Sequence, residues 1–111
     1  MITVIKAKIA HQMELTENER RALETTIFNA IQSIPSAGGT NVKRVYHDTN
    51  IDVSLDKIYV GMTGIPLRMK PTEQTQLAET VGKSIKQQYP AMHVYCKIIT
   101  AKPLDIEWKS D

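Results

Sequence analysis

This 111-residue sequence is poor in cysteine, in aromatic residues and in long apolar runs. Its single cysteine, Cys96, cannot build a disulfide framework, so nothing points to an oxidising compartment. No stretch approaches the roughly 18 apolar residues that a membrane-spanning helix requires. No basic flank precedes an apolar segment near Met1, as it would in a signal peptide. We therefore expect a soluble, cytoplasmic protein without a membrane partner.

An excess of charge of one sign is also lacking. Fourteen Lys and Arg residues stand against twelve Asp and Glu residues, which leaves a formal net charge of only +2. No basic run exceeds two residues, and aromatic residues do not alternate with basic ones along the chain. A stacking platform for bases needs both features, so the sequence predicts no nucleic-acid partner.

Motifs for metals and cofactors are missing as well. His11, His47 and His93 do not have the spacing of metal ligands, and we expect them at the surface or at strand edges. The chain contains no glycine-rich phosphate loop, no nucleophile elbow and no CxxC pair. The sequence therefore predicts neither a metal nor a cofactor.

What the chain does contain is a regular succession of strand and helix patterns. Residues 2–9, 41–47, 57–65 and 92–101 are rich in alternating, β-branched residues, which predicts four strands. Apolar residues at helical spacing predict helices near 15–35 and 71–90. Thr16 with Glu19 has the form of a capping box, and Pro71 stands near the start of the second helix. Residues 102–111 are expected to form a short tail.

The predicted order is βαββαβ, and its two halves, about 1–55 and 56–111, look alike. Thr16-Glu17 and Thr72-Glu73 open the two helices 56 residues apart. Each half should form a βαβ unit with parallel strands and a right-handed crossover. Together they predict one α+β domain over 1–111, with a four-stranded mixed sheet and both helices on one face. Apolar residues on the other face would stay uncovered, so we expect an oligomer.

Four basic residues are candidate ligands for a carboxylate. Lys43 and Arg44 are neighbours on a strand, so alternation sends them to opposite faces and at most one faces a common pocket. Arg68 and Lys70 lie in the loop before the second helix. An arginine fork with a second cation would hold a carboxylate, and a solvated basic loop is the alternative. Tyr95 either packs in the core or an interface, or presents its hydroxyl at a pocket edge.

Three segments, together with the element order and the length, resemble the tautomerase superfamily. They are IPSAGGTNVKRVYHDT (34–49), IYVGMTGIPLRMK (58–70) and VYCKIITAKPLDIEW (94–108). The first two are similar to the 5-carboxymethyl-2-hydroxymuconate isomerase branch, and the third to the macrophage migration inhibitory factor branch. The resemblance covers nearly the whole chain. It implies a homotrimer in which three sheets enclose a central barrel.

The resemblance also implies a catalytic amino-terminal proline, which moves a proton between carbon and oxygen of small keto or enol acids. This chain begins Met1-Ile2 where the family pattern has Met-Pro. Initiator methionine is normally removed only before a small residue, so we expect Met1 to stay. Ile2 then occupies the catalytic position with an amide nitrogen, which cannot act as a base. The displaced α-amine of Met1, or an ordered water, would have to move the proton.

The resemblance implies alternative positions in this chain for the substrate-binding residues of the family. Arg44, or Lys43 if the register shifts by one residue, resembles the first carboxylate-binding arginine. Arg68, with Lys70 as its rival, resembles the second. Tyr95 matches a pocket tyrosine.

Three functional hypotheses follow. The first is a tautomerase-like isomerase that acts on or binds small unsaturated keto or enol carboxylic acids. The second is a non-catalytic trimer that binds a small anion or serves as a scaffold, which the loss of the proline favours mechanistically. The third is a ferredoxin-like dimeric binding module, because βαββαβ describes that topology too. A trimeric mass in solution would support the family, and a dimeric mass would argue against it.

Overall fold

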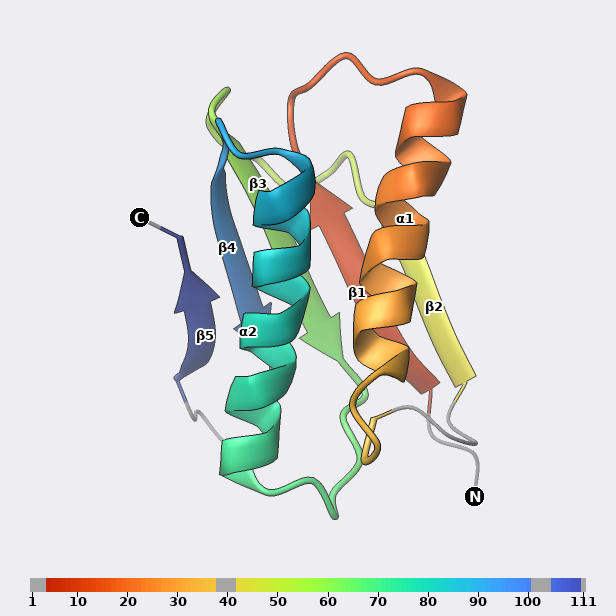
Figure 1. The fold of residues 1–111 in the computed structure, drawn as a ribbon, viewed down its shortest axis with the longest axis vertical. Helices are drawn as coiled ribbons and strands as arrows, with labels where there is room; N and C mark the ends of the chain where they lie inside the picture. The colour runs from red at the N-terminus through yellow and green to blue at the C-terminus, as the bar shows by residue number, and fades with distance from the viewer. Residues whose placement is uncertain (1–3, 38–41, 101–104, 111) are drawn as a thin grey trace.

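Two helices lie side by side on one face of a mixed five-stranded sheet (Figure 1). The computed structural model describes residues 4–37, 42–100 and 105–110. The first half contains β1 (Val4–Ala10), α1 (Glu17–Gln32) and β2 (Val42–His47). The second half contains β3 (Lys57–Thr63), α2 (Pro71–Gln88), β4 (His93–Ile98) and β5 (Ile106–Lys109). The first six elements confirm the predicted βαββαβ order. None of these helices is both long and apolar enough to cross a bilayer.

The strand order is β2-β1-β3-β4-β5, and it places each βαβ unit in one half of the sheet. β1 pairs with β2 in parallel, and β3 pairs with β4 in parallel. The two units meet where β1 runs antiparallel to β3. A ferredoxin-like domain instead splits each βαβ unit by inserting another strand between its two strands. The direct pairing of β1 with β2 and of β3 with β4 is therefore not the ferredoxin-like arrangement.

Both helices begin where the sequence predicts. The Thr16 hydroxyl accepts a hydrogen bond from the Glu19 N–H at 3.2 Å, and the Glu19 carboxylate accepts one from the Thr16 N–H at 3.0 Å. This confirms the capping box. Pro71 is the first residue of α2, and the Glu73 carboxylate accepts a hydrogen bond from the Lys70 N–H at 3.0 Å. A hydrogen bond from Ser36, followed by that of the Lys70 N–H, lowers the pKa of Glu73.

The core lies between the helices and the sheet. Alternate residues of the inner strands and the apolar stripes of both helices are buried in it. The largest are Ile5, Ile9, Leu23, Ile27, Ile31, Ile58, Met62, Leu77, Ile85 and Ile98. Cys96 is also fully buried, and burial raises the pKa of its thiol to about 12. This cysteine therefore packs as a small apolar residue, and its thiol is not a nucleophile at neutral pH.

The sheet has five strands, one more than predicted. The segment expected to be a tail contains β5, which pairs antiparallel with β4 and places Trp108 opposite Cys96. Ser110 extends this pairing, because its N–H donates to the Val94 carbonyl at 2.9 Å and its hydroxyl accepts from the Val94 N–H at 2.8 Å. Trp108 packs against α2 at Gly82, where a Cβ would overlap the indole ring. The strand therefore depends on a contact between segments far apart in sequence.

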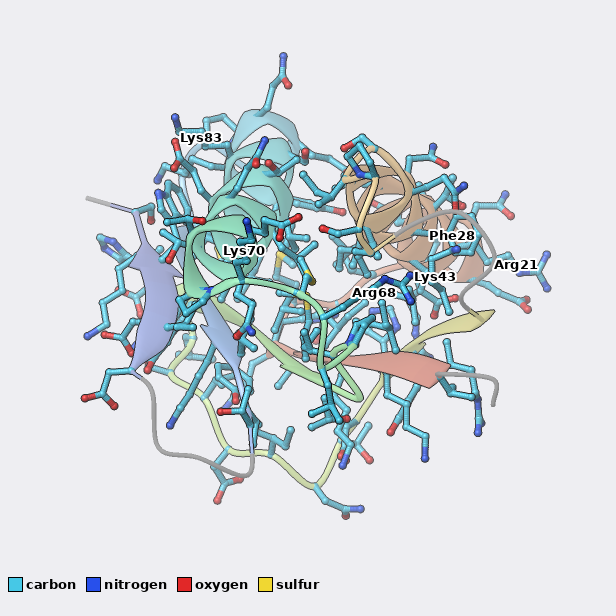
Figure 2. All side chains as sticks on the ribbon, turned by 90° about the horizontal axis from the view of Figure 1, so that it is seen from below. Arg21, Phe28, Lys43, Arg68, Lys70 and Lys83 are labelled. Atoms are coloured by element: carbon cyan, nitrogen blue, oxygen red, sulfur yellow. The ribbon has the colours of Figure 1, made fainter. Side chains whose placement is uncertain are left out.

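The sheet face turned away from the helices, here called the open face, is polar. In Figure 2 the helices lie above the sheet, and the side chains of the open face point downward. By strand register and alternation, this face carries Lys6, Lys8, Arg44, Tyr46, Tyr59, Tyr95, Lys97 and Lys109. The expectation of an apolar open face is therefore wrong, and burial alone does not require an oligomer.

Candidate functional site

A groove runs along the edge of the sheet between α1 and β2. β2 is an edge strand, so α1 covers it from one side only. The groove, here called the edge groove, has a volume of about 550 Å³. It is lined by Arg21, Glu24, Thr25 and Phe28 from α1 and by Lys43, Arg44, Val45 and Tyr46 from β2. Three cations and two aromatic rings thus face one volume with a single carboxylate.

The most unusual residue in the edge groove is Phe28. It is 40% exposed, and the Lys43 Nζ lies 5.6 Å from the centroid of its ring. A cation at this distance over an aromatic face is attracted by the ring quadrupole. An ammonium group beside an exposed aromatic surface suits a ligand with a carboxylate and a flat unsaturated body.

Lys43 and Arg44 confirm the prediction from strand alternation. Lys43 faces the helix side of β2, whereas Arg44 faces the open face with its guanidinium carbon 5.7 Å from the centroid of the Tyr46 ring. Both line the edge groove, because a groove at a sheet edge can be reached from either face. The prediction that only one of them faces a common pocket does not hold for this groove.

The other two predicted cations lie in the loop between β3 and α2, at the end of the sheet where β1 and β2 begin. Gly64 positions this loop: its φ is +74°, and a Cβ there would overlap the carbonyl oxygen of Val4. Figure 2 looks onto this end and shows Arg68 on the side of Lys43 and Phe28, with Lys70 over the start of α2. Arg68 and Lys70 are both exposed.

Tyr95 lies elsewhere, on the open face in β4, with β1 and β3 between it and β2. Its hydroxyl donates a hydrogen bond to the Glu107 carboxylate, which with burial raises the pKa of Tyr95 to about 12. The Lys109 Nζ lies 5.0 Å from its ring centroid. Within one chain, Tyr95 therefore does not line the edge groove. Met1 and Ile2 lie outside the described residues.

Arg21 and Phe28 are groove residues that the sequence prediction missed. The apolar stripe of α1 consists of residues such as Leu23, Ile27 and Ile31, and Phe28 lies outside it. A large aromatic residue off the buried stripe of an amphipathic helix is the signal that would have found this site.

His47 ends the edge strand β2, which agrees with the expectation of a strand edge, although its side chain is only 6% exposed and its ring contacts that of His11. His93 is exposed, and its Nε2 lies 3.6 Å from the Asp56 carboxylate. No group of three or more metal-ligating side chains forms within residues 4–37, 42–100 and 105–110.

Comparison with solved structures identifies the architecture. A crystal structure of 5-carboxymethyl-2-hydroxymuconate delta-isomerase matches with a TM-score of 0.54 over 96% of this chain and 88% of that chain, at 9% sequence identity. The chain has the tautomerase fold. Leishmania major MIF2 matches over 96% of this chain and 97% of its own, with 8% identity and a TM-score of 0.48. No protein-family model and no curated protein sequence matches the chain.

The tautomerase fold confirms the predicted fold class, corrected to five strands. At 9% identity the likeness extends to the path of the chain and not to side chains. The chemistry of this tautomerase-fold chain therefore depends on its own residues.

Proposed function

We propose that this chain binds small unsaturated keto or enol carboxylic acids in the edge groove, as a tautomerase-like protein. The observation that carries the proposal is the exposed Phe28 ring beneath the Lys43 ammonium. The ligand's carboxylate would meet Lys43 and a guanidinium of the groove, while its conjugated body lies on Phe28. The tautomerase fold supports the proposal at the level of architecture.

Among the described residues, the charged side chains that line the groove are three cations and one carboxylate. Arg21 forms an ion pair with Glu17 at 2.6 Å, one helical turn away, and both side chains are largely exposed. Such exposed pairs contribute little and exchange readily. The one carboxylate that lines the groove, Glu24, accepts a hydrogen bond from the buried His47. An incoming carboxylate would therefore meet a net positive field at the α1–β2 edge.

Replacing Lys43 by glutamine is expected to raise the Kd for phenylpyruvate at least about tenfold, because a charge-assisted contact is lost. Calorimetric titration of the wild type and the variant measures this. Lys83→Gln is the matched control, since Lys83 lies on α2 away from the groove, where it pairs with Glu79 (Figure 2). Equal affinities of wild type and Lys43→Gln would contradict the assignment of the groove.

A keto–enol assay on phenylpyruvate separates the tautomerase from the non-catalytic anion binder. Ketonisation above the buffer rate that falls in Lys43→Gln would support turnover at the groove. Tight binding with ketonisation at the buffer rate would support the non-catalytic alternative.

We also propose the homotrimer that the family resemblance implies. The polar open face would then line a hydrated interior, and would not be a dry interface. Light scattering coupled to size exclusion is expected to give three times the mass of one chain, at protein concentrations well above and below that of the binding assays. A dimer or a monomer at all concentrations would contradict the trimer.

A further inference from the structure

Two histidines meet at the end of the sheet opposite the β3–α2 loop. His11 directly follows β1, and His47 ends β2. β1 and β2 are parallel neighbours, so their carboxyl ends lie at the same edge of the sheet. The two imidazole rings have their centroids 5.1 Å apart and stand almost perpendicular, at 89°. The carboxyl ends of adjacent parallel strands are a common location for ligand sites in α/β sheets.

The hydrogen bond of His47 to α1 assigns its tautomer. The His47 Nδ1 lies 2.9 Å from the Glu24 Oε2, and the His47 side chain is 6% exposed. A carboxylate can only accept, so Nδ1 carries the proton and donates it. In the neutral ring Nε2 then has a free lone pair. This carboxylate–imidazole pair has the arrangement that orients a general base and stabilises its protonated form.

His11 has the opposite tautomer. The backbone N–H of Met13 donates a hydrogen bond to the His11 Nδ1 at 3.0 Å. Nδ1 is therefore the acceptor, and in the neutral ring the proton lies on Nε2. Burial lowers the pKa of His11, and the neighbouring His47 and Arg20 lower it further, which favours the neutral ring at pH 7.

The two Nε2 atoms are thus complementary, a base on His47 and a donor on His11. Both are buried, and neither has a hydrogen-bond partner among the described residues. Buried polar atoms without a partner are rare in native proteins and call for an explanation, either a catalytic role or an ordered water. Both rings line a cavity of about 240 Å³, which Arg20, Glu14 and Asp48 also line.

We propose that this cavity is a second, acid–base site, in which His47 Nε2 removes a proton from a carbon next to a carbonyl group and His11 Nε2–H stabilises the resulting enolate oxygen. Glu24 is a positioning residue that holds His47 in the required tautomer. The site has its own cavity and its own cation, and it shares Glu24 with the edge groove. A purely structural ion pair would account for the Glu24 contact but leaves both Nε2 atoms unexplained.

The step balances without a co-reactant. The carbon–hydrogen bond breaks as the His47 nitrogen takes the proton. The electron pair of that bond forms the carbon–carbon double bond of the enolate. The carbonyl electrons move to the oxygen, which accepts the hydrogen bond from His11. His47 then returns its proton to that oxygen to give the enol, or exchanges it with solvent. Nothing is oxidised or reduced.

The cavity selects a substrate with few atoms. Most ligand pockets hold roughly 300–1,000 Å³, so this one is small. Among the described residues that line it, Arg20 supplies the one cation for a carboxylate, whereas Glu14 and Asp48 disfavour any further negative group. The chemistry points to small 2-keto monocarboxylic acids, for which pyruvate is a direct probe.

The test is the exchange of pyruvate methyl hydrogens for deuterium in D₂O, followed by proton NMR. The wild type is expected to exchange them faster than buffer. His47→Gln should lower the enzyme-dependent rate at least about 100-fold, which is the lower range for general base catalysis. His93→Gln is the matched control, because His93 is an exposed histidine outside the cavity, and it should keep the wild-type rate. Lys83→Gln, on α2 and in the lining of neither cavity, should also keep it.

Three further readouts separate catalysis from folding. Glu24→Gln should lower kcat and leave KM for pyruvate unchanged, as expected of a positioning residue, and added imidazole should restore exchange in His47→Gly. Nitrogen-15 NMR of the wild type should show the proton on Nδ1 of His47 and on Nε2 of His11. Exchange at the buffer rate, equal rates in wild type and His47→Gln, or the reverse tautomers would overturn the proposal.

Discussion

Replacing Gly64 by alanine is expected to lower the free energy of unfolding by about 3 kcal/mol or more, because the new side chain meets both backbone strain and overpacking. The φ of +74° lies in the left-handed region, which alanine adopts only at a cost. The added Cβ would also overlap the carbonyl oxygen of Val4. That oxygen belongs to the backbone of β1, so no side-chain rotation relieves the contact.

Urea unfolding of the wild type and the variant measures this loss, and Gly61→Ala is the matched control. A Cβ at position 61 would lie 2.6 Å from the Tyr59 hydroxyl oxygen, which is the far end of a side chain that can rotate away. We expect this control to cost less than about 1 kcal/mol. Equal losses in the two alanine variants would show that the β3–α2 loop is not fixed by its approach to β1.

Gly82→Ala is expected to destabilise the protein by about 2 kcal/mol through overpacking against Trp108. Alanine is a better helix former than glycine by roughly 1 kcal/mol, so helix propensity alone predicts a more stable protein. The contact with Trp108 makes the net change in the free energy of unfolding unfavourable, since a Cβ at position 82 would overlap the indole ring. Displacing the ring should detach β5 from α2.

Trp108 is the only tryptophan, so its fluorescence reports this contact directly. The emission maximum should move to longer wavelength in Gly82→Ala as the ring gains contact with water, and the urea midpoint should fall. Lys83→Ala, at the next position on α2 and exposed, should change neither beyond a few tenths of a kcal/mol. An unchanged spectrum together with a higher midpoint would contradict the packing of Trp108 on Gly82.

The elements that the sequence predicts are those with local signals. The six main helices and strands have a clear period, and their caps lie within a few residues, as Thr16 with Glu19 shows. β5 has four residues and depends on β4 and on Gly82. Neither partner can be recognised from the segment alone, so the sequence predicts a tail there.

The candidate sites also combine features that local sequence predicts with features that depend on contacts between distant segments. Alternation correctly sends Lys43 and Arg44 to opposite faces of β2. Phe28 acquires its role only when α1 packs beside the edge strand. The contact between His11 and His47 follows from the parallel pairing of β1 with β2, and a predicted βαβ unit already implies it. The residues at the carboxyl ends of the two predicted parallel strands are therefore the signal that would have identified this pair.

The open face shows what linear composition conceals. Basic and aromatic residues do not alternate along the chain, yet the sheet brings Lys109 over Tyr95 and Arg44 over Tyr46. The overall net charge of +2 likewise hides the concentration of lysines on this face. Charge patterns on a sheet are set by strand register and cannot be read from runs in the sequence.

The most direct test of the central claim is to map phenylpyruvate onto the protein by amide chemical shifts in the wild type and in Lys43→Gln. The proposal predicts saturable shifts concentrated on α1 around Phe28 and on β2 around Lys43, and a much weaker response in the variant. Shifts confined to other elements, or equal responses in the two proteins, would contradict carboxylate binding in the edge groove.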